Sequence, residues 1–194
     1  MSVSVLYMSM SLDGYVAGPN DGPDNPGGDG FARLHEWFVA GDGSFIRPPG
    51  AAGEIMDEVN ATGSVLAGRR TVEQVDYWKG DHHAGVPIFV PSHRPPGPTV
   101  ANYPSVTYVS DGIASAMAQA KAAAADKNVL VHGAITAQHA LAAGVLDELQ
   151  ISQIPVYVGA GVRLFDSLQS RIELDIVRVI DTPEATHIRY RVRR

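Results

Sequence analysis

The chain has no cysteine among its 194 residues. This absence excludes disulfide bonds, thiolate metal sites and cysteine nucleophiles. Positive charge is also scarce, because 15 Lys and Arg face 21 Asp and Glu and leave a net charge of -6. Binding to nucleic acid or to a membrane surface depends on clustered positive charge, so we expect neither partner. Any arginine used in binding must therefore act locally.

Long apolar runs are missing as well. No run approaches the ~20 residues of a membrane span, and the N-terminus has no basic region followed by a small-residue cleavage site. We therefore expect a cytoplasmic protein. The length suits one domain, residues 1–194, which can bury roughly 70% of the surface of its unfolded chain.

Strand-like and helix-like segments alternate along most of the chain. Strands are predicted over 3–10, 64–67, 86–90, 106–109, 128–132 and 146–155, and helices over 54–60, 69–76, 112–125 and 134–143. Asp111 is expected to cap the third of these helices, and Gly144 to end the fourth. Two strands without a helix between them, 172–180 and 186–193, close the chain. This order predicts an α/β fold whose mostly parallel sheet has an antiparallel C-terminal edge.

Two of the predicted strands run into turns that can hold a phosphate. The apolar strand at 129–132 enters Gly133 and Ala134, and the strand at 64–67 enters Gly68-Arg69-Arg70-Thr71. Small residues let an anion approach the unpaired N–H groups at the start of a helix, and arginines add charge. A chain with two such turns, one of them cationic, suggests a dinucleotide ligand.

The segment 13–30 is rich in Gly, Pro, Asn and Asp and is predicted to form a long loop. Long ordered loops in compact domains are usually lids or binding loops. Asp13 stands where the first strand enters this loop. Its carboxyl group can orient or protonate a substrate ring, or it can secure the turn by accepting backbone N–H bonds.

Several of these segments together resemble a known family. They are Ser11-Leu12-Asp13-Gly14-Tyr15-Val16-Ala17-Gly18, Ala67-Gly68-Arg69-Arg70-Thr71, His132-Gly133-Ala134, and Leu146-Asp147-Glu148-Leu149 leading to Val158-Gly159-Ala160-Gly161. In this order they resemble the dihydrofolate-reductase-like family, in the branch that includes the C-terminal reductase domain of riboflavin biosynthesis. The resemblance implies a three-layer α/β fold and an NADPH-dependent reductase. Its substrate would be a small heteroaromatic or imine-type compound, of the 5-amino-6-(5-phosphoribosylamino)uracil or dihydrofolate type.

The resemblance also implies roles for matched residues. The implied cofactor-binding residues are Ala17, Gly18, Gly68, Arg69, Arg70, Thr71, Ser92, His93, Arg94, Gly133, Ala134, Ile135 and Thr136. A guanidinium fork suits a phosphate, so Arg69 and Arg70 would hold the pyrophosphate and the 2′-phosphate. Trp37 and Glu36 are assigned to the substrate pocket and Asp13 to catalysis. The same branch implies a homodimer.

The chain also departs from this family. Leu34 stands where folate reductases carry the acid that contacts the pterin ring, and His132 stands where riboflavin-pathway reductases commonly carry Glu. Ala137 replaces a tyrosine of the folate enzymes. These departures keep open an alternative, a catalytically idle protein that binds or senses NADP or a flavin.

One more cluster offers metal ligands. Asp81-His82-His83 places three candidate metal ligands side by side, but neighbours in a turn rarely converge on one ion without a third partner. A solvated loop is therefore the preferred interpretation, and no metal is expected. Tyr77-Trp78 and Trp37 suit either a flat aromatic pocket or core packing, and core packing is the preferred interpretation.

Overall fold

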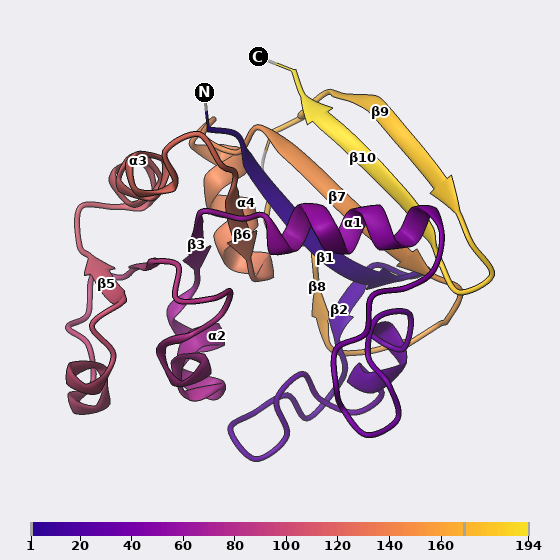
Figure 1. Cartoon of the computed structure of the whole chain (residues 1–194), viewed down its shortest axis with the longest axis horizontal. Coiled ribbons are helices and arrows are strands. Elements are labelled where there is room, and N and C mark those ends of the chain that lie inside the picture. The colour runs from indigo at the N-terminus through magenta and orange to yellow at the C-terminus, as the bar shows by residue number, and fades with distance from the viewer. Residues whose placement is uncertain (1, 169, 194) are drawn as a thin grey trace.

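The computed structural model describes residues 2–168 and 170–193. Within them, an eight-stranded sheet has the strand order β5-β4-β3-β6-β1-β7-β10-β9 (Figure 1). Neighbouring strands from β5 to β7 are parallel, whereas β10 is antiparallel to both β7 and β9. The predicted α/β fold, with a mostly parallel sheet and an antiparallel C-terminal edge, is confirmed.

The elements have the following bounds. The strands of the large sheet are β1 (Ser4–Ser11), β3 (Ser64–Ala67), β4 (Ile88–Pro91), β5 (Val106–Val109), β6 (Val129–His132), β7 (Glu148–Ile154), β9 (Leu174–Asp181) and β10 (Thr186–Val192). A separate pair joins β2 (Tyr15–Ala17) to β8 (Val162–Arg163). The α-helices are α1 (Ala51–Asn60), α2 (Arg69–Gln74), α3 (Ile113–Ala124) and α4 (Ala134–Ala142), and the 3-10 helices are η1 (Phe31–Leu34), η2 (Asp76–Gly80) and η3 (Pro98–Asn102).

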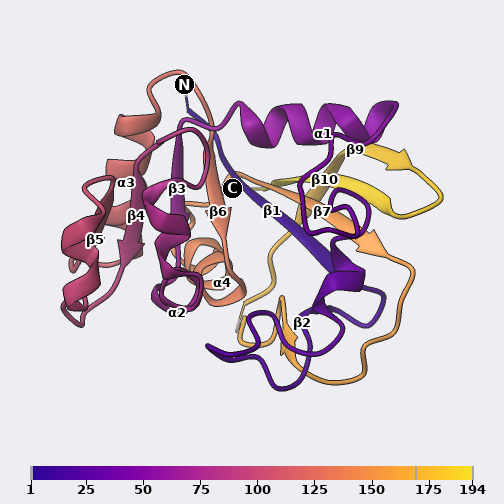
Figure 2. The same ribbon diagram turned by 60° about the horizontal axis from the view of Figure 1, so that its bottom comes forward.

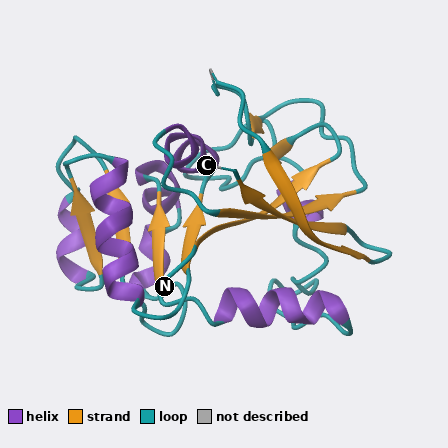
Figure 3. Cartoon of the chain, turned by 90° about the horizontal axis from the view of Figure 1, so that it is seen from above, coloured by secondary structure: helices purple, strands orange, loops and turns teal. Residues whose placement is uncertain are grey.

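Successive residues of the central strands are buried on opposite faces of the sheet. Leu6 and Leu66 pack into a core with α3 and α4. Val5 and Val65 pack into a second core with residues of α1, α2 and η1. Because both faces are covered, these strands are apolar on both sides. The result is the predicted three-layer arrangement, seen from above in Figure 3.

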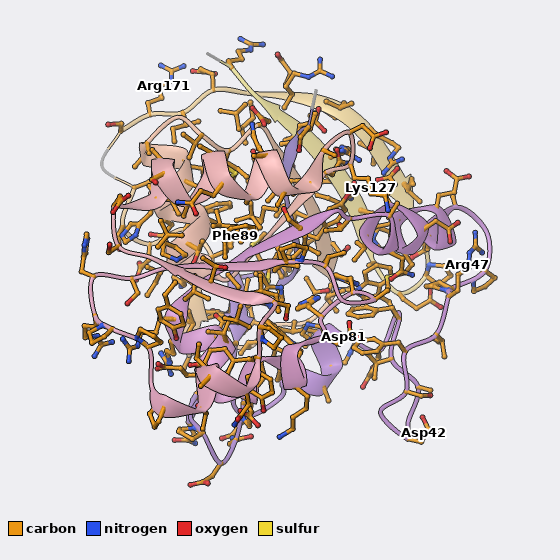
Figure 4. The ribbon with its side chains drawn as sticks, turned by 60° about the vertical axis from the view of Figure 1, so that its left-hand side comes forward. Asp42, Arg47, Asp81, Phe89, Lys127 and Arg171 are labelled. Atoms are coloured by element: carbon orange, nitrogen blue, oxygen red, sulfur yellow. The ribbon has the colours of Figure 1, made fainter. Side chains whose placement is uncertain are left out.

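The helices of one layer divide the sheet into two halves. Figure 2 shows α1 over the half of the sheet that holds β9 and β10, whereas α2 lies below β3 and β4 and contacts β4. Ion pairs fix α1 in place, because Glu58 contacts Arg178 of β9 and Arg189 of β10, each at 2.6 Å. The segment that leads into α1 is also held against this helix, because Arg47 contacts Asp57 of α1 at 2.7 Å. Figure 4 shows Arg47 beside this helix and Asp42 at the tip of the preceding loop.

The structure corrects some predicted boundaries. The segment 13–30 is not a continuous loop, because β2 pairs with β8 through Tyr15 and Arg163. Asp111 does not cap α3, since Gly112 occupies the N-cap position without a side-chain hydrogen bond. Gly144 has φ 66° after the last turn of α4, as expected for a glycine that ends a helix.

The helix predicted over 69–76 ends early for a physical reason. Asp76, Tyr77, Trp78 and Lys79 all have positive φ, between 45° and 55°. L-residues pay roughly 1–2 kcal/mol each for a left-handed helical turn, so surrounding contacts must hold it. The Asp76 carboxylate contacts Lys79 and accepts a hydrogen bond from Tyr103 Oη at 3.0 Å.

None of the helices in the described ranges has the length and apolar character that crossing a membrane requires.

Candidate active site

A cleft of about 2050 Å³ opens where the parallel strands end. The carboxyl ends of β3, β4 and β6 meet there, as expected for ligand sites in open α/β sheets. The cleft also continues beneath α1, along β1 and β7. Of the residues predicted to bind cofactor or substrate, those that line it are Ala17, Glu36, Trp37, Gly68, Arg69, Arg70, Thr71, Ser92, His93, Arg94, Gly133, Ala134, Ile135 and Thr136.

The two predicted phosphate turns lie side by side and interlock. Their strands are neighbours, with Ala67 opposite His132. An added Cβ on Gly68 would lie 2.6 Å from Thr136 Oγ1, and one on Gly133 would lie 2.9 Å from Thr71 Oγ1. Each glycine therefore makes room for the threonine of the other turn. This packing brings the start of α2 and the start of α4 against each other at the end of the cleft.

The two arginines of the first turn have different environments. Arg69 is only 19% exposed; it contacts Glu73 at 2.7 Å and donates to the Pro95 carbonyl at 2.8 Å. Arg70 is 58% exposed and contacts the Asp21 carboxylate at 2.8 Å. The sequence predicted equivalent roles for this pair. In the structure Arg69 joins α2 to the loop after β4, and Arg70 is the more accessible cation.

Asp21 ties the segment 18–30 across the cleft to α2. Its Oδ1 accepts hydrogen bonds from Gln74 Nε2 at 2.9 Å and from the Gly27 N–H at 2.8 Å, besides the Arg70 contact. Gly18 does not line the cleft. It anchors the same segment, because its N–H donates to the Gly27 carbonyl and an added Cβ would lie 1.8 Å from the Asp29 carbonyl oxygen.

The turn after β4 is organised by its own serine. Ser92 Oγ donates to the Arg94 carbonyl at 3.0 Å and accepts from the Arg94 N–H at 3.2 Å. His93 and Arg94 are exposed at the rim of the cleft. This geometry presents two basic side chains next to the first phosphate turn.

Asp13 lies outside the cleft lining and holds two loops together. Its carboxylate accepts hydrogen bonds from Ser11 Oγ at 2.7 Å, from the Val158 N–H at 3.1 Å and from the Gly159 N–H at 2.7 Å. Partial desolvation alone would raise the pKa of this carboxyl, but the hydrogen bonds outweigh it and lower the pKa to about 2. These contacts favour the turn-securing alternative over the acid that the sequence also allowed.

Histidines form one wall of the cleft, which the sequence did not predict. The His82 ring lies 5.7 Å from that of His132 and 4.3 Å from that of His83, and Trp78 packs against His82 at 4.0 Å. Burial, then the neighbouring His132 and His83, lower the pKa of His82 to about 2. Burial, then His35 and His83, lower that of His132 to about 4. This wall is therefore neutral at physiological pH.

These histidines do not form a metal site in the described ranges, where no group of three or more suitable ligands converges. The Asp81 carboxylate is used within its own turn, because its Oδ1 accepts a hydrogen bond from the Gly85 N–H at 2.7 Å. Asp81 is labelled in Figure 4. The left-handed turn of η2 explains the convergence, because it carries Trp78 and then His82 back toward β6.

The part of the cleft that lies beneath α1, along β1 and β7, forms its floor, and this floor is polar. Trp37 Nε1 donates to Ser9 Oγ at 2.9 Å, and Ser152 Oγ lies 2.8 Å from His187 Nδ1. Leu34, at the place of the folate-reductase acid, is fully buried. The Glu36 side chain is directed toward solvent, where it contacts Arg33 at 3.4 Å and remains 60% exposed.

Known structures share the fold of this chain. A chain from Shewanella sp. PV-4, described as a riboflavin biosynthesis protein, is 22% identical over 99% of both chains, with a TM-score of 0.74. The diaminohydroxyphosphoribosylaminopyrimidine deaminase/5-amino-6-(5-phosphoribosylamino)uracil reductase of Thermotoga maritima is 13% identical, with a TM-score of 0.62. Our chain is covered over 98% of its length but spans only 56% of that protein.

The dihydrofolate reductase of Enterococcus faecalis, solved with NADP(H), shares the fold as well. It is 12% identical over 98% of our chain and 96% of its own, with a TM-score of 0.57. No significant match was found among curated proteins. The fold is thus that of the dihydrofolate-reductase-like proteins.

The RibD C-terminal domain family matches residues 4–188. The chain therefore belongs to this family, which is a family of reductases. The resemblance stated from the sequence motifs is confirmed.

Proposed function

We propose that this reductase uses NADPH and transfers its hydride to a small heterocyclic or imine-type substrate, of the 5-amino-6-(5-phosphoribosylamino)uracil type. The observation that carries the proposal is the pair of interlocked turns with an accessible cation beside them, next to a separate polar floor. The turns suit a phosphate-bearing cofactor and the floor suits a polar ring. The cofactor supplies the hydride, and the chain supplies position.

The residues of the cleft fit NADPH. The glycines at 68 and 133 let the two turns lie against each other, and the N–H groups at the start of a helix favour an anion. The exposed guanidinium groups of Arg70 and Arg94 add positive charge for a 2′-phosphate, and His93 lies beside them at the rim. Because Asp21 holds Arg70 at 2.8 Å, an incoming phosphate would exchange with this carboxylate.

Folate reduction is disfavoured by the same cleft. Leu34 is buried in the core, so no carboxylate stands at the position that contacts the pterin ring in folate reductases. A second candidate function is a protein that binds NADP or a flavin without turnover. It is favoured by Asp13, whose carboxylate is fully engaged with Ser11 and the loop at 158–159.

One set of assays separates these functions. Calorimetry with NADPH and NADH tests the cofactor, and a flavin that copurifies would colour the protein yellow. Oxidation of NADPH is then followed with the phosphoribosylaminouracil compound, dihydrofolate, and a panel of imines and quinones. Turnover of the uracil compound is expected. NADPH binding without turnover of any compound would support the idle binding protein instead.

We further propose that the protein is a homodimer that pairs through the antiparallel half of the sheet. The face opposite α1 carries a cavity of about 220 Å³ whose apolar lining is Met10, Leu149, Ile151, Phe165, Leu174, Ile188 and Tyr190. Beside it on the edge strand, Ile176 is 68% exposed and Val179 is 55% exposed. An apolar edge of this kind needs a partner or a cover.

A further inference from the structure

Beneath α1, two buried side chains of the cleft carry O–H or N–H groups that donate to no acceptor within the described residues. They are Tyr7 Oη and Gln150 Nε2. Tyr7 is 8% exposed and Gln150 is 1% exposed, yet both line the cleft beneath α1. An unsatisfied buried polar group costs about 1–3 kcal/mol, which a ligand that bonds to it can recover. The pair therefore points to a ligand.

The sheet places these two groups side by side. Tyr7 of β1 and Gln150 of β7 are paired residues in the parallel ladder. In the same row, Gln150 is paired with Arg189 of β10, and Arg189 with Arg178 of β9. The four side chains thus follow one line across the face that α1 covers.

The row also fixes which atoms are free. Gln150 Oε1 accepts a hydrogen bond from Arg178 at 3.2 Å, so the Nε2 donor must point elsewhere. Arg189 lies next to Tyr7, but a guanidinium offers no acceptor for the phenolic proton. Burial, opposed by Arg189, raises the pKa of Tyr7 to about 12, so this proton is present at physiological pH. Both free groups are donors.

Carboxylates neutralise the two arginines of this row. Arg178 and Arg189 contact Glu58, and Arg189 also contacts Glu148 at 2.7 Å. Each arginine of the row is therefore paired with a carboxylate, Arg191 also contacts Glu148 at 3.5 Å, and the row presents neutral donors to the cleft. Such a surface selects a neutral ligand edge that accepts hydrogen bonds, and it selects against an edge made of amino groups.

We propose that Gln150 and Tyr7 are the specificity-determining residues of the substrate site, and that they hold a carbonyl oxygen of a planar cyclic lactam or ureide. This inference rests on the proposed function, because it assigns the ring of that substrate to the floor beneath α1. The inference identifies the edge of the ring to which the two side chains bind. A 2,4-dioxo ring binds here, and a 2,4-diamino ring does not.

The test compares two small probes, uracil and 2,4-diaminopyrimidine, by ligand-observed NMR on the full chain saturated with NADPH. Gln150→Glu keeps an acceptor for Arg178 but replaces the free donor with an acceptor. The wild type is expected to prefer uracil, and Gln150→Glu to shift the ratio of the two affinities toward the diamino probe by about tenfold or more. Tyr7→Phe is expected to weaken uracil binding about three- to tenfold.

Gln153 provides the matched control. It lies three residues along β7 and faces the opposite side of the sheet, where it lines the smaller cavity. Gln153→Glu should leave the probe ratio unchanged. An unchanged ratio in folded Gln150→Glu protein overturns the proposal, as does a folded wild type that binds NADPH and neither probe. If Gln150→Glu does not fold, Tyr7→Phe decides. Loss of NADPH binding in the wild type would contradict the proposed function instead.

Discussion

Gly68 and Thr136 belong to different strand-to-helix turns, yet an added Cβ on Gly68 would lie 2.6 Å from Thr136 Oγ1. The φ of Gly68 is -71°, which any residue can adopt, so the glycine is required for space and not for backbone freedom. The two turns can therefore be close only while this position lacks a side chain.

Gly68→Ala is expected to lower NADPH affinity, because the new methyl group must push Thr136 and the start of α4 away. The double variant Gly68→Ala/Thr136→Ala should recover most of the loss, since it removes the clashing hydroxyl. Calorimetry on the single and double variants measures this coupling. Gly97→Ala is the control, because Gly97 has φ -69° and nothing within 4 Å of an added Cβ. Equal losses in the single and double variants would contradict the steric explanation.

Arg69→Ala and Arg70→Ala are expected to differ. Removing the exposed Arg70 should reduce the preference for NADPH over NADH, at roughly 1.5–3 kcal/mol for a lost charged hydrogen bond. Removing Arg69 should instead lower the melting temperature, because its contacts join Glu73 and Pro95. Calorimetry with both cofactors and thermal melts of both variants check this. An unchanged cofactor preference in Arg70→Ala would refute the assignment.

Asp13→Asn is expected to destabilise the fold in a pH-dependent way. The folded pKa of about 2 lies below the usual value of 3.8, so the charged carboxylate favours the folded state above the latter pH. This contribution is lost as the pH falls from 3.8 toward 2. Melting temperatures of wild type and variant should thus differ at neutral pH and converge in acid.

The same variant tests the catalytic alternative for Asp13. Turnover per folded molecule should match the wild type, with the substrate identified in the assays above. A decrease of roughly 10²-fold with unchanged NADPH affinity would restore Asp13 as the positioned acid.

The dimer prediction is tested on the edge strand. Wild-type protein should scatter light with twice the monomer mass of 20.6 kDa. Ile176→Lys/Val179→Lys should give the monomer mass, because both side chains are exposed on the apolar face and charge there opposes its burial. Thr107→Lys on β5 is the control, since Thr107 is exposed at the opposite edge of the sheet. A wild-type mass near 20.6 kDa would rule out the dimer.

Local patterns predicted most of the fold. The doubly apolar first strand, the two glycine turns and the final pair of strands each left a signal in consecutive residues. Asp111 does not cap α3 because the helix begins one residue later than predicted, so that Gly112 is the N-cap residue. Composition alone does not reveal which of the two residues precedes the helix. The left-handed turn at 76–79 contradicts intrinsic preferences, so no local pattern could predict it.

The cofactor side of the cleft could be predicted because its residues follow strands directly. The floor could not, because Tyr7 and Gln150 lie 143 positions apart and read as ordinary strand residues. Only the register of β1 with β7 brings them together. The histidine wall has the same origin, since His132 meets His82 through the fold and not through spacing. The one available signal was the unusual run His82-His83.

The position of β10 between β7 and β9 has a consequence for the order in which the molecule can assemble. The strands β1, β3, β4, β5 and β6 draw only on residues 4–132, and the second phosphate turn ends at Thr136, so both phosphate turns can form before the chain beyond α4 has been synthesised. Glu58 finds its arginine partners only when residues 178 and 189 arrive. Until then α1 lacks its anchors, and a nascent chain would hold a cofactor surface without a substrate floor.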